Sequence, residues 1–129
     1  MKKFIFTLCA ALLLLCLGMT VAAAETAVYV SDTGNDLADG KSDATPLKTL
    51  AAAYDYLPKD GGKIVVCGPL TLSGSALHLP QNSGIVTFTS SVGSVNYAKT
   101  SEARLNLTGY TYLGGDTVFE NITVHDAST

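Results

Sequence analysis

The chain has 129 residues and a formal net charge of −3, and 47% of its residues are hydrophobic. This length suits one small domain. The acidic balance excludes most nucleic-acid-binding classes, because contact with phosphates requires a basic surface, so we expect no nucleic-acid partner.

Residues 1–24 have the pattern of a secretory signal peptide, which predicts a secreted or cell-surface protein. Two lysines precede an apolar run from Phe4 to Leu17, and small residues end the segment at Ala24. The run is shorter than the roughly 20 residues of a membrane-spanning helix, so we expect cleavage after Ala24 and no membrane attachment afterwards. The remaining cysteine, Cys67, lies in an apolar run and is expected to be a buried free thiol.

Residues 25–62 are predicted to form an N-terminal unit of strand, polar loop and helix. The strand comes first, because Val28, Tyr29 and Val30 are β-branched or aromatic and turn-forming residues follow them. We expect this strand at the edge of a sheet.

The loop after this strand is dense in oxygen-bearing side chains and has two interpretations. The four residues concerned are Asp32, Asn35, Asp36 and Asp39. Clustered carboxylate and amide oxygens are ligands that calcium prefers. The spacing does not match an EF-hand, however, since Leu37 and Asp43 stand where that motif has Gly and Glu. We therefore favour successive Asx turns, with a calcium site as the alternative.

An amphipathic helix is predicted over residues 46–57, with Thr45 as its N-cap and Pro46 at its first position. Four apolar residues recur on one face with helical spacing: Leu47, Leu50, Tyr54 and Leu57. Because a helix this short is marginal alone, we expect it to cover one end of the strands that follow.

Residues 63–129 contain short strand-like runs separated by Gly, Ser, Asn and Pro, and no further helix is predicted there. The runs are residues 64–67, 69–72, 76–79, 85–89, 105–107, 110–113, 117–119 and 122–124. If Ile64, Ile85, Leu105 and Ile122 are aligned, they give a loose repeat of about 20 residues, the length of one solenoid coil. An immunoglobulin-like sandwich is the alternative. The preceding helix and the lack of recognised hairpin dipeptides favour the solenoid.

Two parts of the chain resemble the sequences of a known group of proteins. The first comprises Tyr29-Val30-Ser31, Gly34-Asn35-Asp36, Asp39-Gly40, Pro46-Leu47-Lys48-Thr49-Leu50 and Ala53, and the second is Val118-Phe119-Glu120-Asn121-Ile122-Thr123-Val124. They resemble the N-terminal region and the coils of secreted bacterial right-handed parallel β-helix proteins of the pectate-lyase-like group. The resemblance implies an all-β fold: an incomplete parallel β-helix of about three coils with an N-terminal capping helix.

The same resemblance implies a carbohydrate-related role and leaves two classes of function open. Lyases of this group use a basic residue with calcium held by several acids on later coils, and no residue of this chain matches such a position. We expect the N-terminal segment of a secreted or cell-surface β-helix protein, non-catalytic by itself. The alternative is part of a polysaccharide lyase or hydrolase whose catalytic residues lie downstream of this chain.

Few residues of the sequence are candidates for binding a polysaccharide or a metal ion. Tyr110 and Tyr112 lie two positions apart, so on a strand their rings share one face, where they could stack on a polysaccharide or pack in the core. We favour the core. His78 and His125 are isolated in the sequence and are expected at the surface rather than in a metal site.

The last strand-like runs, within residues 117–124, are expected to leave the stack open. A parallel solenoid buries its core only when both ends are covered, and the predicted helix covers one of them. Unpaired backbone groups beside Val118, Ile122 and Val124 would then recruit another strand. We expect further β-helix coils or self-association at this C-terminal edge, and partial unfolding of an isolated monomer.

Overall fold

A computed structural model describes residues 25–73, 77–78, 84–109, 111–113 and 115–126. The predicted signal peptide, Tyr110 and the side chain of His78 lie outside this description.

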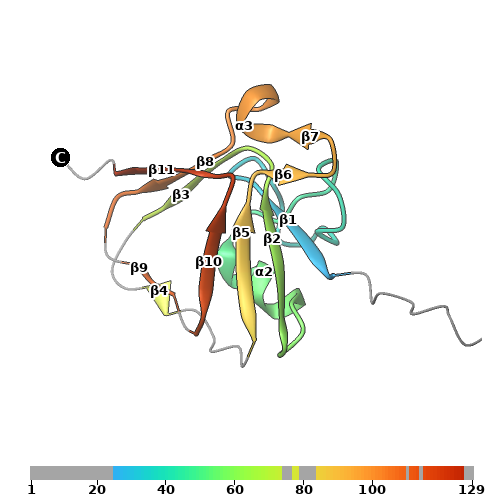
Figure 1. Cartoon of the computed structure of the whole chain (residues 1–129), viewed down its shortest axis with the longest axis vertical. Helices are drawn as coiled ribbons and strands as arrows, with labels where there is room; N and C mark the ends of the chain where they lie inside the picture. The colour runs from blue at the N-terminus through green and yellow to red at the C-terminus, as the bar shows by residue number, and fades with distance from the viewer. Residues whose placement is uncertain (1–24, 74–76, 79–83, 110, 114, 127–129) are drawn as a thin grey trace, which may run out of the picture.

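The described chain is built mainly of strands in parallel sheets, with two short helices (Figure 1). A four-stranded sheet has the order β1 (Ala27–Val30), β2 (Gly61–Val66), β5 (Ile85–Thr89) and β10 (Thr117–Glu120). A three-stranded sheet has the order β11 (Thr123–Asp126), β8 (Arg104–Leu107) and β3 (Pro69–Leu72). A two-stranded sheet pairs β4 (Leu77–His78) with β9 (Thr111–Tyr112). The predicted all-β class is therefore confirmed, and its larger sheets are parallel.

The chain visits these three sheets in a fixed order. Strands β2, β3 and β4 lie in the four-, three- and two-stranded sheets respectively, strands β5, β8 and β9 repeat that order, and β10 and β11 begin it again. Each strand pairs in parallel with its counterpart from the previous passage, as in the column Ile64, Phe88 and Phe119. The alternate residues of these strands form a buried core between the sheets, with Ile64 and Phe88 fully buried.

The alignment of Ile64, Ile85, Leu105 and Ile122 as equivalent positions is wrong. Ile64 pairs with Phe88, whereas Leu105 belongs to the three-stranded sheet and pairs with Leu70 and Val124. The passages through the sheets differ in length, so a constant period cannot align them.

An insertion between β5 and β8 accounts for part of this difference. Strands β6 (Ser91–Val92) and β7 (Val95–Asn96) form an antiparallel hairpin, and helix α3 (Tyr97–Thr100) follows it. The expectation that this region holds neither a hairpin nor a helix is therefore wrong. Gly93, with φ 57°, and Ser94 form a two-residue turn that suits a hairpin, but strands this short have no detectable periodicity.

Helix α2 (Leu50–Tyr56) begins later than predicted. Leu47 is extended instead and forms a parallel bridge with Val30. Its N–H donates to the Tyr29 carbonyl at 2.8 Å, and its carbonyl accepts from Ser31 at 2.9 Å. Thr49, not Thr45, is the N-cap, because its hydroxyl oxygen accepts the N–H of Ala52 at 3.2 Å. Pairing with β1 satisfies the backbone of Leu47 better than a first helical turn would.

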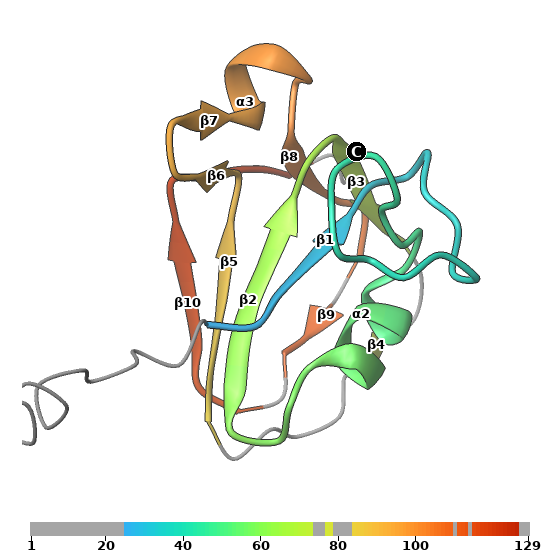
Figure 2. The same cartoon turned by 90° about the vertical axis from the view of Figure 1, so that its right-hand side faces the viewer.

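The predicted burial of the helical stripe is confirmed for Leu50, Tyr54 and Leu57, whereas Leu47 is buried outside the helix. Leu50, Ala53, Tyr54 and Leu57 are buried, and α2 contacts β1. Strand β1 is one edge of the four-stranded sheet and β10 is the other. Figure 2 shows α2 on the β1 side, away from β10.

Cys67 is a buried free thiol, as expected. Burial raises its pKa to about 11, although hydrogen bonding to the backbone opposes part of this effect. A thiol with this pKa stays protonated at neutral pH and is a poor nucleophile.

Candidate functional site

The Asp- and Asn-rich loop contains the Asx turns that its sequence favours. The side-chain oxygen of Asn35 accepts the N–H of Leu37 at 3.0 Å. Asp39 accepts the N–H of Lys41 at 3.1 Å and the hydroxyl of Thr45 at 2.6 Å. The Thr45 hydroxyl makes the largest contribution to lowering the pKa of Asp39.

Asp36 and Asp32 hold more distant segments, which the sequence did not reveal. One Asp36 carboxylate oxygen accepts the N–H groups of Lys48 and Thr49, each at 2.8 Å, and the other accepts the Thr49 hydroxyl at 3.0 Å. Asp32 makes the same pair of bonds to Thr71 in β3, with the N–H at 2.9 Å and the hydroxyl at 2.8 Å. The loop is thereby fastened both to the start of α2 and to the three-stranded sheet.

The ionisation of Asp36 reflects this arrangement. Its partial desolvation would raise the pKa, but the hydrogen bonds from Thr49 and Lys48, together with the Lys48 charge, outweigh it and lower the pKa. The folded protein therefore favours the carboxylate form of Asp36.

The four candidate calcium ligands use their oxygens for separate protein donors. Asp32 faces Thr71, Asp36 faces Lys48 and Thr49, and Asn35 and Asp39 each bond within the loop. In the described part of the chain, no three His, Cys, Asp or Glu residues are grouped so that they could hold a metal ion.

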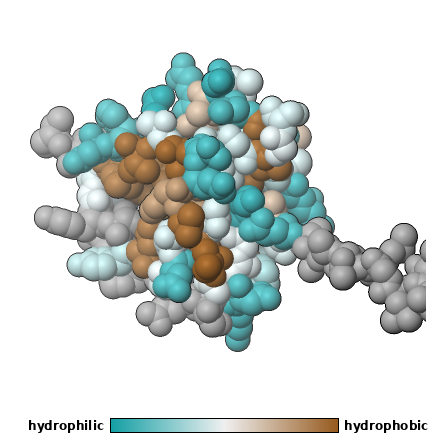
Figure 3. All heavy atoms as spheres, viewed as in Figure 1, coloured by the Kyte–Doolittle hydropathy of each residue, from teal (hydrophilic) through white to brown (hydrophobic). Residues whose placement is uncertain are grey.

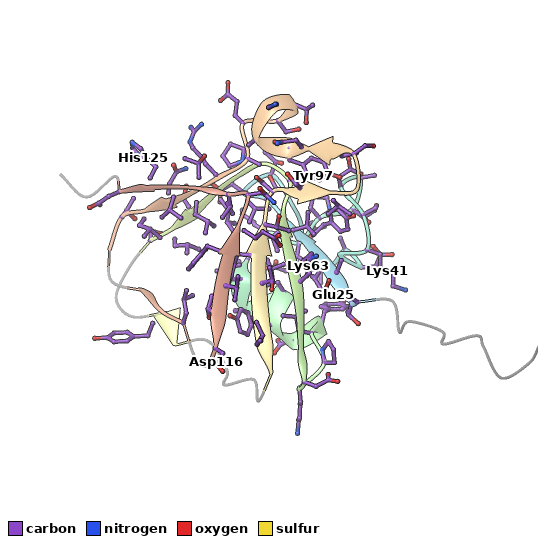
Figure 4. The ribbon with its side chains drawn as sticks, viewed as in Figure 1. Glu25, Lys41, Lys63, Tyr97, Asp116 and His125 are labelled. Carbon is purple, nitrogen blue, oxygen red and sulfur yellow. The ribbon has the colours of Figure 1, made fainter. Side chains whose placement is uncertain are left out.

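A polar row crosses the outer face of the three-stranded sheet, and this row is our candidate binding site. Parallel pairing places Thr71 beside Asn106 and Asn106 beside His125. Each of these residues alternates with an apolar neighbour, Leu70, Leu105 and Val124, whose column faces the core. Figure 4 shows His125 projecting away from β11.

Arg104 adds a cation beside this row. Its Nε donates to the side-chain oxygen of Asn106 at 3.1 Å, and its guanidinium lies 3.5 Å from the Glu102 carboxylate. Because the Asn106 oxygen is engaged, its amide N–H groups are the part of that side chain left to bond other acceptors.

A sequence pattern indicates this row, but only when the segments of β3, β8 and β11 are aligned with one another. Leu70-Thr71-Leu72 and Leu105-Asn106-Leu107 each place one polar residue between two apolar ones, and Val124-His125-Asp126 begins in the same way. Grouping Ile64 with Leu105 separated these segments, so the three polar residues were not recognised as neighbours. His125 is at the surface, as expected.

The two candidate tyrosines cannot be compared, because Tyr110 lies outside the described residues. Tyr112 lies in β9 with its side chain 61% exposed, so the interpretation that places it in the core is wrong. Its ring therefore lies at the surface.

The open end of the sheets forms a second feature of the surface. A cavity of about 240 Å³ between the two larger sheets is lined by apolar residues alone: Leu72, Phe88, Leu105, Leu107, Leu113, Phe119 and Val124. It lies beside β10 and β11, and Figure 3 shows apolar side chains gathered over these strands.

Comparison of the chain with protein-family models, with curated proteins and with solved structures finds no match. Among the described residues, neither helix has the length and apolar character needed to cross a membrane.

Proposed function

We propose that this chain is the N-terminal part of an exported right-handed parallel β-helix protein, and that it contacts carbohydrate without catalysing a reaction. The observation that carries the proposal is the repeated order of the three sheets, in which each strand pairs with its counterpart from the previous passage. A chain that winds around one axis produces this order. Crossovers between parallel strands are nearly always right-handed, which supports the same handedness here.

Helix α2 supports the placement of this chain at the start of such a stack. Its buried face contacts β1, the edge strand before the first complete passage, and Leu57 packs close to Gly62 at the start of β2. A helix in this place covers apolar side chains that a preceding coil would otherwise cover.

The polar row on the three-stranded sheet supports contact with a polysaccharide. Neighbouring strands lie about 4.8 Å apart, so Thr71, Asn106 and His125 offer hydrogen-bonding groups at regular intervals across the sheet. Sugar hydroxyls both donate and accept hydrogen bonds, which suits the amide N–H groups of Asn106 and the imidazole of His125. The Thr71 hydroxyl donates its proton to Asp32, so it is left to act as an acceptor. The exposed ring of Tyr112 adds an amphipathic surface for stacking.

Binding to soluble polysaccharides tests the carbohydrate contact. We expect the chain to bind at least one member of a panel that contains polygalacturonate and neutral plant polysaccharides, as measured by affinity electrophoresis and calorimetry. The Tyr112→Ala variant should bind about fivefold more weakly, since one aromatic contact contributes about 1 kcal/mol.

Tyr56→Ala is the matched control, because Tyr56 is also an exposed tyrosine, 50% accessible, but lies on α2. Equal losses in the two variants would contradict a specific role for Tyr112. Absence of binding to every polysaccharide would contradict the carbohydrate contact, and release of unsaturated ends from polygalacturonate would contradict the non-catalytic role.

A further inference from the structure

Two side chains of the polar row have their hydrogen-bonding direction fixed by charged neighbours. The Asp32 carboxylate has no proton to give, so the Thr71 hydroxyl, 2.8 Å away, must donate to it. The Arg104 Nε–H can only donate, so the side-chain oxygen of Asn106, 3.1 Å away, must face it. Towards a ligand, Thr71 is therefore left as an acceptor and Asn106 as a donor.

These two residues lie side by side on an open surface. Thr71 and Asn106 are direct partners in the parallel register of β3 and β8, so their backbones are about 4.8 Å apart. Thr71 is exposed and Asn106 is half-buried. A following coil would pair with the edge of β11, because strands of a sheet pair edge to edge, and it would leave this outer face open.

A ligand group that bridges this pair must donate to Thr71 and accept from Asn106. A sugar hydroxyl does both, because it carries one proton and two lone pairs. A carboxylate only accepts, so it would place its lone pairs against those of Thr71, with the Asp32 charge directly behind them. A carboxylate therefore gains one hydrogen bond here where a hydroxyl gains two.

Arg104, the cation beside the row, is poorly placed to bind a carboxylate. A guanidinium binds a carboxylate best through two parallel hydrogen bonds, given either by Nε and one terminal nitrogen or by the two terminal nitrogens. Its Nε already donates to Asn106, and its Nη1 lies 3.5 Å from a carboxylate oxygen of Glu102. Each of the two donor pairs thus has one member in use.

The charges around the row also favour a neutral ligand. Lys48 lines a hollow of about 190 Å³ together with Thr71, but it lies close enough to the Asp36 carboxylate to interact with its charge. Arg104 is paired with Glu102 in the same way. Because each of these cations has an acid beside it, a polyanion gains little by approaching them.

We propose that the row binds neutral polysaccharides and discriminates against uronate polymers, with Asn106 as the specificity-determining donor. Arg104 is a positioning residue, because it holds the oxygen of Asn106 and leaves the amide N–H groups to the ligand. This inference rests on the proposed carbohydrate contact and adds the class of polysaccharide.

Pairs of polymers that differ in charge alone test the class of ligand. Each polysaccharide that binds the full chain is compared by calorimetry with its counterpart: neutral polymers are oxidised at C6 to uronates, and polygalacturonate is reduced to its neutral hydroxymethyl form. We expect the neutral member to bind about tenfold more tightly, since the uronate loses one hydrogen bond and meets the Asp32 charge. Added salt should leave binding of the neutral member unchanged, because no ion pair forms.

The outcomes separate this inference from the proposed function. Equal or tighter binding of the uronate member would overturn the inference while the carbohydrate contact stands. Absence of binding to every polymer would overturn both.

Asn106→Asp tests the donor. The new carboxylate has nearly the shape of the amide and still accepts from Arg104, but it cannot donate to a sugar. We expect neutral polymers to bind about fivefold more weakly, the usual effect of losing one hydrogen bond. Asn35→Asp adds the same charge at an exposed loop residue whose side-chain oxygen also accepts an N–H, so it should bind as the wild type does. Equal losses in both variants would overturn the role of Asn106.

Arg104→Gln tests the positioning. Without the guanidinium the Asn106 amide gains a second orientation, so we expect about twofold weaker binding of neutral polymers and an unchanged preference over uronates. The side-chain amide signals of Asn106 in nuclear magnetic resonance spectra should shift in this variant. A loss of uronate binding alone would show that Arg104 holds a carboxylate and would overturn the inference. Far-UV circular dichroism checks that each variant is folded.

Discussion

At the scale of single residues, Asp36 connects the loop, the start of α2 and the bridge to β1. It bonds Lys48 and Thr49, which directly follow Leu47, the residue that pairs with Val30. Its carboxylate thus fixes the point where an extended segment becomes a helix. A sequence pattern based on local caps cannot find this partner, because it lies 13 positions from Thr49.

Substitution of Asp36 should therefore weaken the N-terminal unit. We expect Asp36→Ala to reduce the free energy of unfolding by about 1 kcal/mol, comparable with the loss of a helix N-cap. Urea denaturation followed by circular dichroism measures the change. Asp55→Ala, at an exposed acidic residue within α2, should have an effect of less than about 0.5 kcal/mol. Equal effects in both variants would contradict the role of Asp36.

The lowered pKa values of Asp36 and Asp39 give this unit a dependence on pH. A carboxyl group with a lower pKa in the folded state stabilises the fold above its unfolded pKa, and this contribution is lost as the pH falls through the folded pKa. The melting temperature should therefore decline below about pH 4. The decline should be smaller in the Asp36→Asn, Asp39→Asn double variant, and an unchanged slope would argue against these two groups.

At the scale of elements, most strands and their parallel pairing were predicted, but which runs occupy equivalent positions was not. The runs 69–72 and 85–89 match the bounds of β3 and β5, because uninterrupted apolar and β-branched residues favour strands locally. Which strands pair depends on contacts between residues far apart in the chain. Successive passages of the chain through the three sheets differ in length, partly because the β6–β7 hairpin is inserted in one of them. The sequence therefore has no constant repeat length that would indicate which strands pair.

The close approach of the first residues of β2 and β5 provides a test of this pairing. A Cβ atom on Gly61 would lie 2.2 Å from the Ile85 carbonyl oxygen, and the φ of Gly61 is 100°. Gly61→Ala should therefore destabilise the protein by several kcal/mol, because backbone atoms of β5 cannot move aside cheaply.

Gly93→Ala separates this clash from the cost of the backbone conformation. Gly93 also has a positive φ, 57°, but a Cβ there would meet nothing within 4 Å. We expect this variant to lose about 1 kcal/mol, the cost of a left-handed conformation. If thermal unfolding shows equal losses for Gly61→Ala and Gly93→Ala, the two strands do not approach as described.

At the scale of the whole molecule, the two ends of the sheets differ. Helix α2 lies at the β1 end, whereas the β10 end exposes apolar side chains beside a cavity. The sequence predicted this asymmetry from one helix followed by strands. It did not predict the polar row of Thr71, Asn106 and His125, since that row exists only when three distant strands are paired.

Interstrand nuclear Overhauser effects in an isotopically labelled sample test the winding of the chain most directly. The account predicts parallel contacts from Phe88 in β5 to Ile64 on one side and to Phe119 on the other, and from Leu105 to both Leu70 and Val124. Antiparallel contacts between residues 64–67 and 69–72 would contradict it and would indicate a hairpin-based sandwich instead.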